Sequence, residues 1–241
     1  MKTQIKTTRV ILIAFLFLFA NISFSQDGGT LSFAKQNKGK HYTSFAFGMG
    51  AAYGNNPSLT TYIEYELSGY NNVPDSRKLK DLRTGFEFFG NVERQVAKNI
   101  AVKLDYGYFI KSSKVDDYPN SYFDYNNHQI YLGANYLIPG DYHFIKIGLG
   151  AGPVFSTLDS KAFTVNDGTY TSTGILAKAE GTFSLQMGGS LAGYLSGYVG
   201  NVFNGTLKRD DGKELKNSAG ETVNLSSFML GVRIGIEFYI F

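Results

Sequence analysis

The sequence predicts an all-β protein: a closed, antiparallel, up-and-down barrel of eight strands that crosses a membrane. Three observations favour this fold class. The chain ends on a long segment with apolar residues at every second position, short and long connections alternate along it, and its 241 residues include 28 Gly, 17 Tyr and 20 Phe but only 5 Pro. Transmembrane barrels use such a composition for strands and for girdles of aromatic side chains.

The closing segment, 226–241, carries the clearest pattern. Its apolar row consists of Phe228, Leu230, Val232, Ile234, Ile236, Phe238 and Ile240. Met229, Gly231, Arg233, Gly235, Glu237 and Tyr239 alternate with that row. A period of two predicts a strand with one face in an apolar medium and the other in surroundings that tolerate charge. Seven apolar positions match the length that a tilted strand needs to cross a bilayer.

Residues 1–25 are expected to be a secretory signal peptide that is cleaved before Gln26. Lys2, Lys6 and Arg9 precede an apolar run, and a small-x-small site follows it. A membrane-anchoring helix is the alternative, but the apolar run is short for a span. Residues 26–41 are then a periplasmic lead-in, and residues 42–241 are the barrel.

Cysteine and charge content exclude several classes of function. The chain has no cysteine, which excludes disulfides, thiolate metal sites and a lipoprotein anchor. Its formal charge of +3 comes from 23 basic and 20 acidic residues. Without the three basic residues of the signal the two signs balance, so nucleic acid is not an expected partner. The length of residues 26–241, without the signal peptide, suits one domain.

Further alternating segments are expected from the start of the barrel onward. The first seven strands are predicted at 42–54, 82–94, 100–110, 128–138, 143–155, 176–191 and 195–207. Long connections are predicted at 55–81, 112–127, 156–175 and 208–224, and short ones at 94–99, 139–143 and 191–195. Residues 59–67 fit either a short helix or a strand extension. In the hairpin of the second and third strands, Asn91 is expected opposite Lys103, with Glu93 diagonal to Lys103.

This pattern resembles the small Gram-negative outer-membrane barrels of the OmpA-transmembrane-domain and OmpX kind. The resemblance rests on the even strand count, the alternating connections and a last strand that ends on Phe241. Phe241 departs from the pattern of these barrels in one respect: it lies in the row of Glu237 and Tyr239, whereas their terminal residue lies in the lipid-facing row. It implies an outer-membrane location, contact with outer-membrane lipid, insertion by the barrel-assembly machinery and no cofactor. A soluble sandwich or lipocalin-like barrel is the alternative, which the signal peptide, the outward aromatic residues and the closing strand disfavour.

The inward rows contain charged and amide side chains that are expected to form a lumen polar network. Its predicted members are Arg83, Glu87, Asn91, Glu93, Lys103, Asp105, Lys146, Arg233 and Glu237, with Glu180 also facing inward. The lumen of an eight-stranded barrel is only wide enough for side chains to fill. A paired ionic plug is therefore the preferred interpretation, and a narrow charged conduit is the alternative.

An enzymatic site would need a nucleophile and a base. His128 is predicted at the outer rim, and Ser112, Ser113 and Asp124 are nearby in the sequence. Such a serine–histidine pair resembles that of lipid-hydrolysing barrels, but the segment contains no nucleophile motif. A rim histidine in the interfacial belt is the preferred interpretation, and the chain is expected not to be an enzyme.

The long loops hold the remaining candidates. Asp116, Asp117, Tyr122 and Tyr125 combine carboxylates with aromatic rings and are candidates for binding a sugar, a cation or a partner. Residues 210–214 resemble a calcium loop but lack its ligand spacing, so no metal site is predicted. We therefore expect a non-enzymatic barrel with a structural, adhesive or partner-docking role through its extracellular loops. A narrow channel is the second hypothesis, and an outer-leaflet lipid hydrolase the third.

Overall fold

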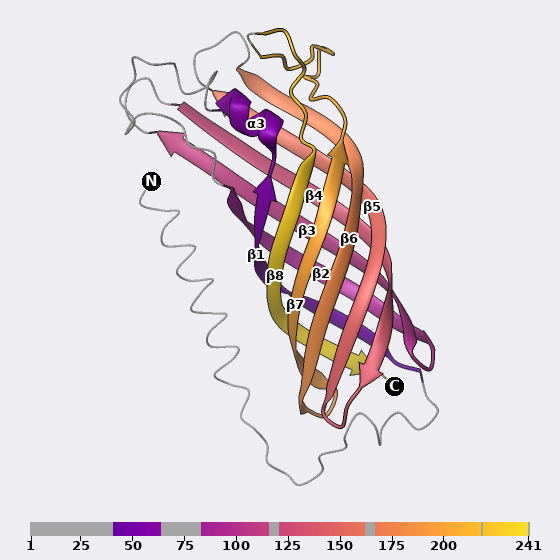
Figure 1. Cartoon of the computed structure of the whole chain (residues 1–241). Helices are drawn as coiled ribbons and strands as arrows, with labels where there is room; N and C mark the ends of the chain where they lie inside the picture. The colour runs from indigo at the N-terminus through magenta and orange to yellow at the C-terminus, as the bar shows by residue number, and fades with distance from the viewer. Residues whose placement is uncertain (1–40, 64–82, 116–120, 162–166, 218, 241) are drawn as a thin grey trace. The chain divides into compact units, whose positions relative to one another are not determined.

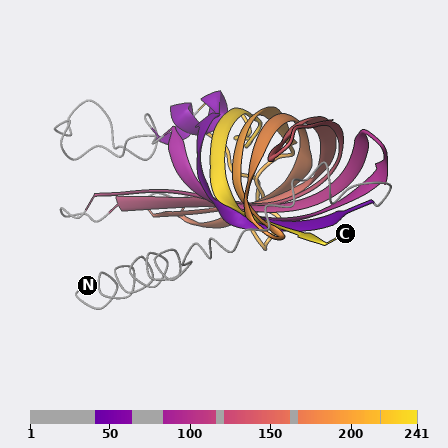
Figure 2. The ribbon, with the colours of Figure 1, turned by 90° about the horizontal axis from the view of Figure 1, so that it is seen from below.

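Eight antiparallel strands form a closed barrel in the computed structural model, which describes residues 41–63, 83–115, 121–161, 167–217 and 219–240. The strands are β1 (Thr43–Asn55), β2 (Thr84–Ala97), β3 (Ile100–Val115), β4 (Ser121–Pro139), β5 (His143–Lys161), β6 (Gly168–Gly188), β7 (Leu191–Asn204) and β8 (Ser227–Ile240). Each strand pairs with the next, and β8 pairs with β1 (Figures 1 and 2). The predicted fold class is confirmed. The predicted signal peptide, 1–25, lies outside the described residues.

One end of the barrel has tight connections, and we call it the short-turn end. Only Lys98 and Asn99 separate β2 from β3, and only Gly189 and Ser190 separate β6 from β7. The strand pairing places Glu93 opposite Lys103 and Asn91 opposite Asp105. The predicted pairing of Asn91 with Lys103 is therefore wrong, because the β2–β3 turn is shorter than expected and contains an irregularity at residues 95–97.

At the opposite end, which we call the long-loop end, the strands are longer than the sequence predicts. β4 begins at Ser121 and β6 at Gly168, so most of the predicted loops 112–127 and 156–175 are strand. In these extensions polar residues such as Ser112, Asp124 and Asn126 occupy the outward row, and apolar residues such as Phe123 and Tyr125 occupy the inward row. The outward apolar row that identifies a membrane strand is therefore missing there, although the backbone pairing continues.

A belt of exposed apolar side chains surrounds the barrel. Residues such as Val232 and Ile234 are 60% and 64% exposed, which is unfavourable in water. On β8 the belt runs from Phe228 to Ile240, which is about 40 Å of strand. A tilt of about 45° reduces this to about 28 Å, close to the apolar band of outer-membrane barrels. The belt is therefore the lipid-facing surface. No helix in the described segments is long and apolar enough to span a membrane.

A short helix follows β1. Helix α3 (Pro57–Thr61) begins after Asn56, whose Oδ1 accepts a hydrogen bond from the Leu59 amide at 2.9 Å. Proline at the first helical position and an amide cap are usual at a helix start. The helix accounts for the beginning of the predicted 59–67 segment, and residues 64–67 lie outside the described part of the chain.

The segment 205–226 between β7 and β8 is folded by two similar turns. Gly212 and Gly220 both have φ of +80°, a conformation that favours glycine, and each amide bonds back three residues, to Arg209 and Asn217. The turns bring the backbones of Leu207, Leu215 and Val223 together, since Leu215 bonds to Leu207 at 3.0 Å and Val223 to Leu215 at 2.9 Å. All three side chains are buried.

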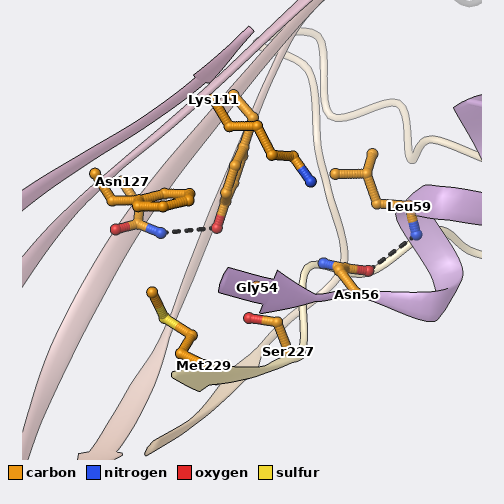
Figure 3. Close-up of a pocket in the computed structure, with 9 residues that line it drawn as sticks. Gly54, Asn56, Leu59, Lys111, Asn127, Ser227 and Met229 are labelled. Carbon is orange, nitrogen blue, oxygen red and sulfur yellow. Dashed lines mark hydrogen bonds between the residues drawn. The ribbon is translucent and has the colours of Figure 1, made fainter. Parts of the chain in front are cut away.

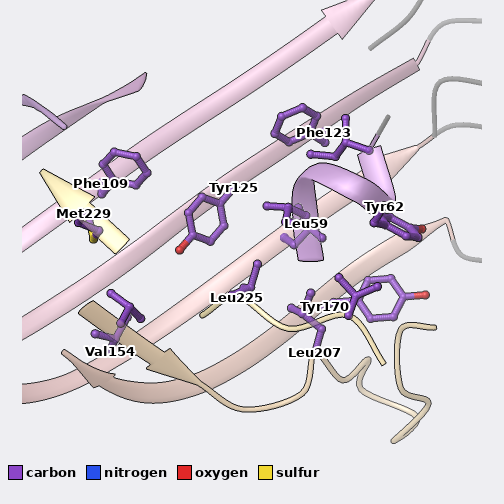
Figure 4. Close-up of a cluster of buried hydrophobic side chains, with 14 of the residues drawn as sticks. Leu59, Tyr62, Phe109, Phe123, Tyr125, Val154, Tyr170, Leu207, Leu225 and Met229 are labelled. Atoms are coloured by element: carbon purple, nitrogen blue, oxygen red, sulfur yellow. The ribbon is translucent and has the colours of Figure 1, made fainter. Parts of the chain in front are cut away.

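These apolar side chains close the long-loop end of the barrel. The cluster, which we call the outer plug, joins α3, segment 205–226 and the inner faces of the strands (Figure 4). Its members include Leu59, Tyr62, Ile63, Phe109, Phe123, Tyr125, Val154, Leu158, Tyr170, Leu207, Leu215, Val223, Leu225 and Met229. A hydrophobic core of this kind excludes water from that end of the lumen.

Candidate functional site

Strand alternation turns one row of each strand into the barrel, where charged side chains form two layers. The layer nearer the short-turn end, which we call the lower layer, is centred on Lys146 of β5. Its Nζ lies 2.7 Å from Glu93 Oε1 on β2 and 2.6 Å from Glu237 Oε1 on β8. All three side chains are at least 98% buried. Strand pairing thus brings together groups from the first, middle and last parts of the barrel sequence.

Neutral side chains saturate the remaining carboxylate oxygens in this lower layer. Hydroxyl groups donate to Glu93 from Tyr42 at 2.6 Å, and to Glu237 from Ser44 at 2.7 Å, Ser184 at 2.6 Å and Tyr239 at 2.8 Å. Asn135 also donates to Glu93. Buried ions are tolerated only when their hydrogen-bonding capacity is met. In the lower layer, each carboxylate oxygen of Glu93 and Glu237 accepts at least one hydrogen bond.

The second layer, which we call the upper layer, is centred on Arg233 of β8. Its guanidinium bonds Glu87 and lies 2.8 Å from Asp105, and its carbon sits 5.0 Å from the ring centres of both Phe89 and Tyr198. The planar guanidinium suits both the carboxylates and the aromatic faces. The arginine side chain therefore contacts residues of β2, β3 and β7 across the lumen.

Two lysines complete this upper layer. Lys103 pairs with Glu180, and Lys178 lies 3.6 Å from Asp105 and 3.5 Å from Glu180. The ammonium of Lys178 also lies 4.3 Å from the ring centre of Tyr131. Acidic and basic groups alternate across the lumen, which offsets part of the cost of removing them from water, although Lys178 Nζ has no hydrogen-bond partner among the described residues.

Glycines beside the large side chains allow this dense filling. A Cβ built on Gly133 falls 2.5 Å from Tyr131 Oη, and one built on Gly231 falls 2.4 Å from Tyr198 Cζ. The aromatic rings thus lie directly over backbone without side chains. Together the rings and the two charged layers occupy the lumen across its width.

The structure buries all but one of the predicted members of the lumen polar network. Glu87, Asn91, Glu93, Lys103, Asp105, Lys146, Arg233 and Glu237 are each at most 6% exposed. Arg83 is the exception and a correction: it precedes β2, its side chain is exposed, and it belongs to neither layer. Lys178 and the lumen tyrosines are members that the sequence did not predict. Lys178 shares the inward row of Glu180, so parity within β6 was the signal that could have revealed it.

The predicted loop candidates do not form one site. Asp116 and Asp117 lie outside the described residues. Tyr122 and Tyr125 lie on β4, three residues apart, and therefore on opposite faces. Tyr125 is buried in the outer plug, edge-on to Phe109 with ring centres 6.0 Å apart. A site that uses both rings on one surface is excluded by this alternation.

The proposed serine–histidine pair is not formed either. Ser112 lies opposite Asp124 and donates to its carboxylate, whereas His128 lies opposite Tyr108. The offset of four positions separates Ser112 from His128 by about 13 Å along the strands. His128 Nδ1 is 2.7 Å from the Tyr106 hydroxyl, and its ring stacks on Tyr108 with ring centres 4.7 Å apart. His128 is thus part of the aromatic rim.

The described residues contain no group of three or more His, Cys, Asp or Glu side chains that could hold a metal ion. In the 210–214 turn two of the acidic groups pair with basic ones instead. Asp211 bonds Arg209, and Glu214 lies 3.6 Å from Lys208. The hydrogen bond from Arg209 lowers the pKa of the Asp211 carboxyl to about 2.

A small cavity lies beside Leu59, Phe109, Tyr125 and Met229 of the outer plug (Figure 3). Its volume of about 10 Å³ is room for one water molecule. Polar groups on its wall include Asn56, Asn127 and Ser227, and Asn127 donates to Tyr125 Oη at 2.8 Å. The cavity is too small for a solute or a hydrated ion to enter.

Comparison with known proteins supports the fold. No protein-family model and no curated protein sequence matches the chain. Among solved structures, it is similar to the attachment invasion locus protein of Yersinia pestis, crystallised with the heparin analogue sucrose octasulfate. The TM-score is 0.50 and the identity 10%, over 83% of this chain and 99% of that protein.

Two further barrels align more loosely. A major outer-membrane protein of Thermus thermophilus gives a TM-score of 0.47 with 12% identity, over 82% of this chain and 99% of that one. Neisserial surface protein A gives 0.45 with 12% identity, over 82% and 96%. At such identities the likeness concerns the fold alone. The closed order of eight strands and the likeness to the Yersinia pestis protein show that the chain has the fold of the small eight-stranded outer-membrane β-barrels, as its resemblance to the OmpA- and OmpX-like proteins predicts.

Proposed function

We propose that this protein is a closed, non-conducting and non-enzymatic outer-membrane barrel that serves as a docking or adhesion surface through its long-loop end. One observation carries the proposal: the lumen is filled twice, by the two charged layers and by the outer plug. A conducting pore needs a continuous water-filled path, and both fillings interrupt one.

The charged layers support a plug rather than a conduit because their partners come from within the barrel. Lys146 has two carboxylate partners, and Arg233 has two carboxylates and two aromatic rings. An ion that entered would have to displace these contacts. Each buried pair costs about 3–5 kcal/mol to break by removal of one partner.

The outer plug supports the docking role. It attaches α3 and the described residues of segment 205–226 to the strands, and these parts of the long-loop end form a folded cap. A rigid surface loses less conformational entropy on binding than a mobile loop does. The long-loop end would face the cell exterior, since outer-membrane barrels place their short turns in the periplasm.

Single-channel recording of residues 26–241 in planar bilayers tests the proposal. We expect no conductance steps from protein that is folded and inserted, as shown by a β-type circular dichroism spectrum and protection from protease. Reproducible steps whose ion selectivity reverses in Arg233→Glu would overturn the plug and make the protein a channel.

Export and membrane insertion form part of the same proposal. Residues 1–25 would be removed as a signal peptide, and the barrel-assembly machinery would insert the remainder. Mass spectrometry of protein purified from outer membranes should then give a chain that begins at Gln26. An intact N-terminus in the outer membrane would contradict the cleavage.

A further inference from the structure

A polar groove lies on the surface between α3 and the second turn of segment 205–226. Its lining residues are Pro57, Ser58, Thr61, Asn217, Glu221, Thr222 and Asn224. Its volume of about 540 Å³ lies within the range of about 300–1,000 Å³ that is usual for small-ligand sites. The two walls come from segments on either side of most of the barrel sequence, so only folding creates the groove.

One hydrogen bond joins the two walls of the groove, and two more fix Glu221 within the second turn. The Asn224 amide donates to Ser58 Oγ at 3.2 Å and ties the turn to α3. Asn217 Nδ2 donates to Glu221 Oε2 at 3.0 Å, and the Glu221 amide donates to Asn217 Oδ1 at 2.8 Å. The Glu221 carboxylate is thus oriented at the groove before any ligand arrives.

The outer plug supports the groove from below. Leu59 lies between Ser58 and Thr61 in α3, and Val223 lies between Thr222 and Asn224. Both apolar side chains are buried in the plug while their polar neighbours line the groove. The alternation therefore fixes the groove side chains on a packed core, and the site is preorganised.

The chemistry of the lining selects a class of ligand. The groove offers three hydroxyl groups, two amides and one carboxylate, and no lining residue is a lysine, arginine or histidine. Hydroxyls and amides both donate and accept hydrogen bonds, and a carboxylate accepts them strongly from hydroxyl donors. The lining itself offers no cation to offset the Glu221 charge against a sulfated or carboxylated ligand, and exposed Lys216, which pairs with Thr222, lies outside the lining.

We propose that this groove binds an uncharged, hydroxyl-rich segment of a glycan, with Glu221, Asn217 and Thr222 accepting hydrogen bonds from sugar hydroxyls. The inference rests on the proposed docking role of the long-loop end and names its ligand class. It places binding on α3 and the second turn, away from the lumen and from the aromatic rim around His128.

A glycan array probed with the full barrel in nanodiscs tests the inference. We expect binding to neutral oligosaccharides and none to sulfated or acidic ones. Thr61→Arg, which fills the groove, should abolish binding, and Glu221→Gln should weaken it about tenfold through loss of a charge-assisted hydrogen bond. Thr169→Arg places the same side chain on the outer wall of β6 and should bind as the parent does.

Binding only to sulfated or acidic glycans, binding that survives Thr61→Arg, or no binding across the array would overturn the inference. Circular dichroism and protease protection of each variant show that loss of binding is not loss of folding. The two proposals fail separately. An array without binding would contradict the glycan site and leave the proposal of a closed docking barrel in place. Conductance of the parent protein would contradict the closed barrel and leave the array result unaffected.

Discussion

At the scale of single residues, Lys146 has the largest predicted effect on stability. Lys146→Met would leave Glu93 and Glu237 buried beside each other without their shared cation. We expect the free energy of unfolding to fall by about 3–5 kcal/mol, the usual cost of removing one partner from a buried ion pair. Urea unfolding of the barrel in lipid vesicles, followed by tyrosine fluorescence, measures it.

Lys98→Met is the matched control for that substitution. Lys98 occupies the exposed β2–β3 turn, so the same chemical change should alter stability by no more than about 0.5 kcal/mol. Equal effects of the two substitutions would show that the lower layer contributes no more than an exposed charge.

Gly231 tests how tightly the lumen is filled. A Cβ at this position would fall 2.4 Å from Tyr198 Cζ, so Gly231→Ala should force the ring or the strand to move. Overpacking of this kind costs about 1–3 kcal/mol. Gly181→Ala is the control, because Gly181 faces outward and its Cβ would meet nothing within 4 Å. A stable Gly231→Ala barrel would indicate an open space beside Tyr198.

At the scale of elements, segment 205–226 should resist protease on intact cells because Leu207, Leu215 and Val223 attach it to the outer plug. Leu215→Asp places a charge in that core and should release the segment, giving cleavage at Lys213 or Lys216 by trypsin. Local opening governs such cleavage, so the barrel itself should stay intact.

Glu214→Asp is the comparison for that experiment, since Glu214 is half-buried at the surface next to Leu215. Its segment should stay uncut under the conditions that cut Leu215→Asp. Cleavage of the parent protein at the same rate as Leu215→Asp would show that the cap is not attached to the plug.

At the scale of the whole molecule, the apolar belt defines where lipid contacts the barrel. Val232 lies near the middle of the β8 row and is 60% exposed, so Val232→Arg should destabilise the inserted barrel by about 2–4 kcal/mol. Thr169→Arg, on the part of β6 beyond the belt, should change stability by less than about 1 kcal/mol. Unfolding in lipid vesicles measures the free energy lost by each variant. An equal loss for the two variants would show that the apolar belt extends to Thr169.

The sequence predicts the fold only where the strands contact lipid. Where strands cross the bilayer, one row must be apolar, and the alternation on β3, β5 and β8 reveals both the strand and the inward identity of Lys103, Lys146 and Arg233. Beyond the bilayer the outward row becomes polar, as at Ser112 and Asp124, while the inward row carries buried apolar residues such as Phe123 and Tyr125. Strand extensions there lack the outward apolar row of a membrane strand, and they are predicted as loops.

The sequence by itself determined the barrel, its strand count, the lipid-facing rows and most of the charged lumen, because each depends on a local pattern that the membrane imposes. Only the tertiary structure decided which charges pair, that Arg83 belongs to neither charged layer, and that α3 and segment 205–226 close the long-loop end. Those features depend on register and on contacts between segments far apart in the chain, such as Ser58 with Asn224. A one-dimensional pattern does not contain distances of that kind, and a single-residue change in a turn shifts every pair along the hairpin.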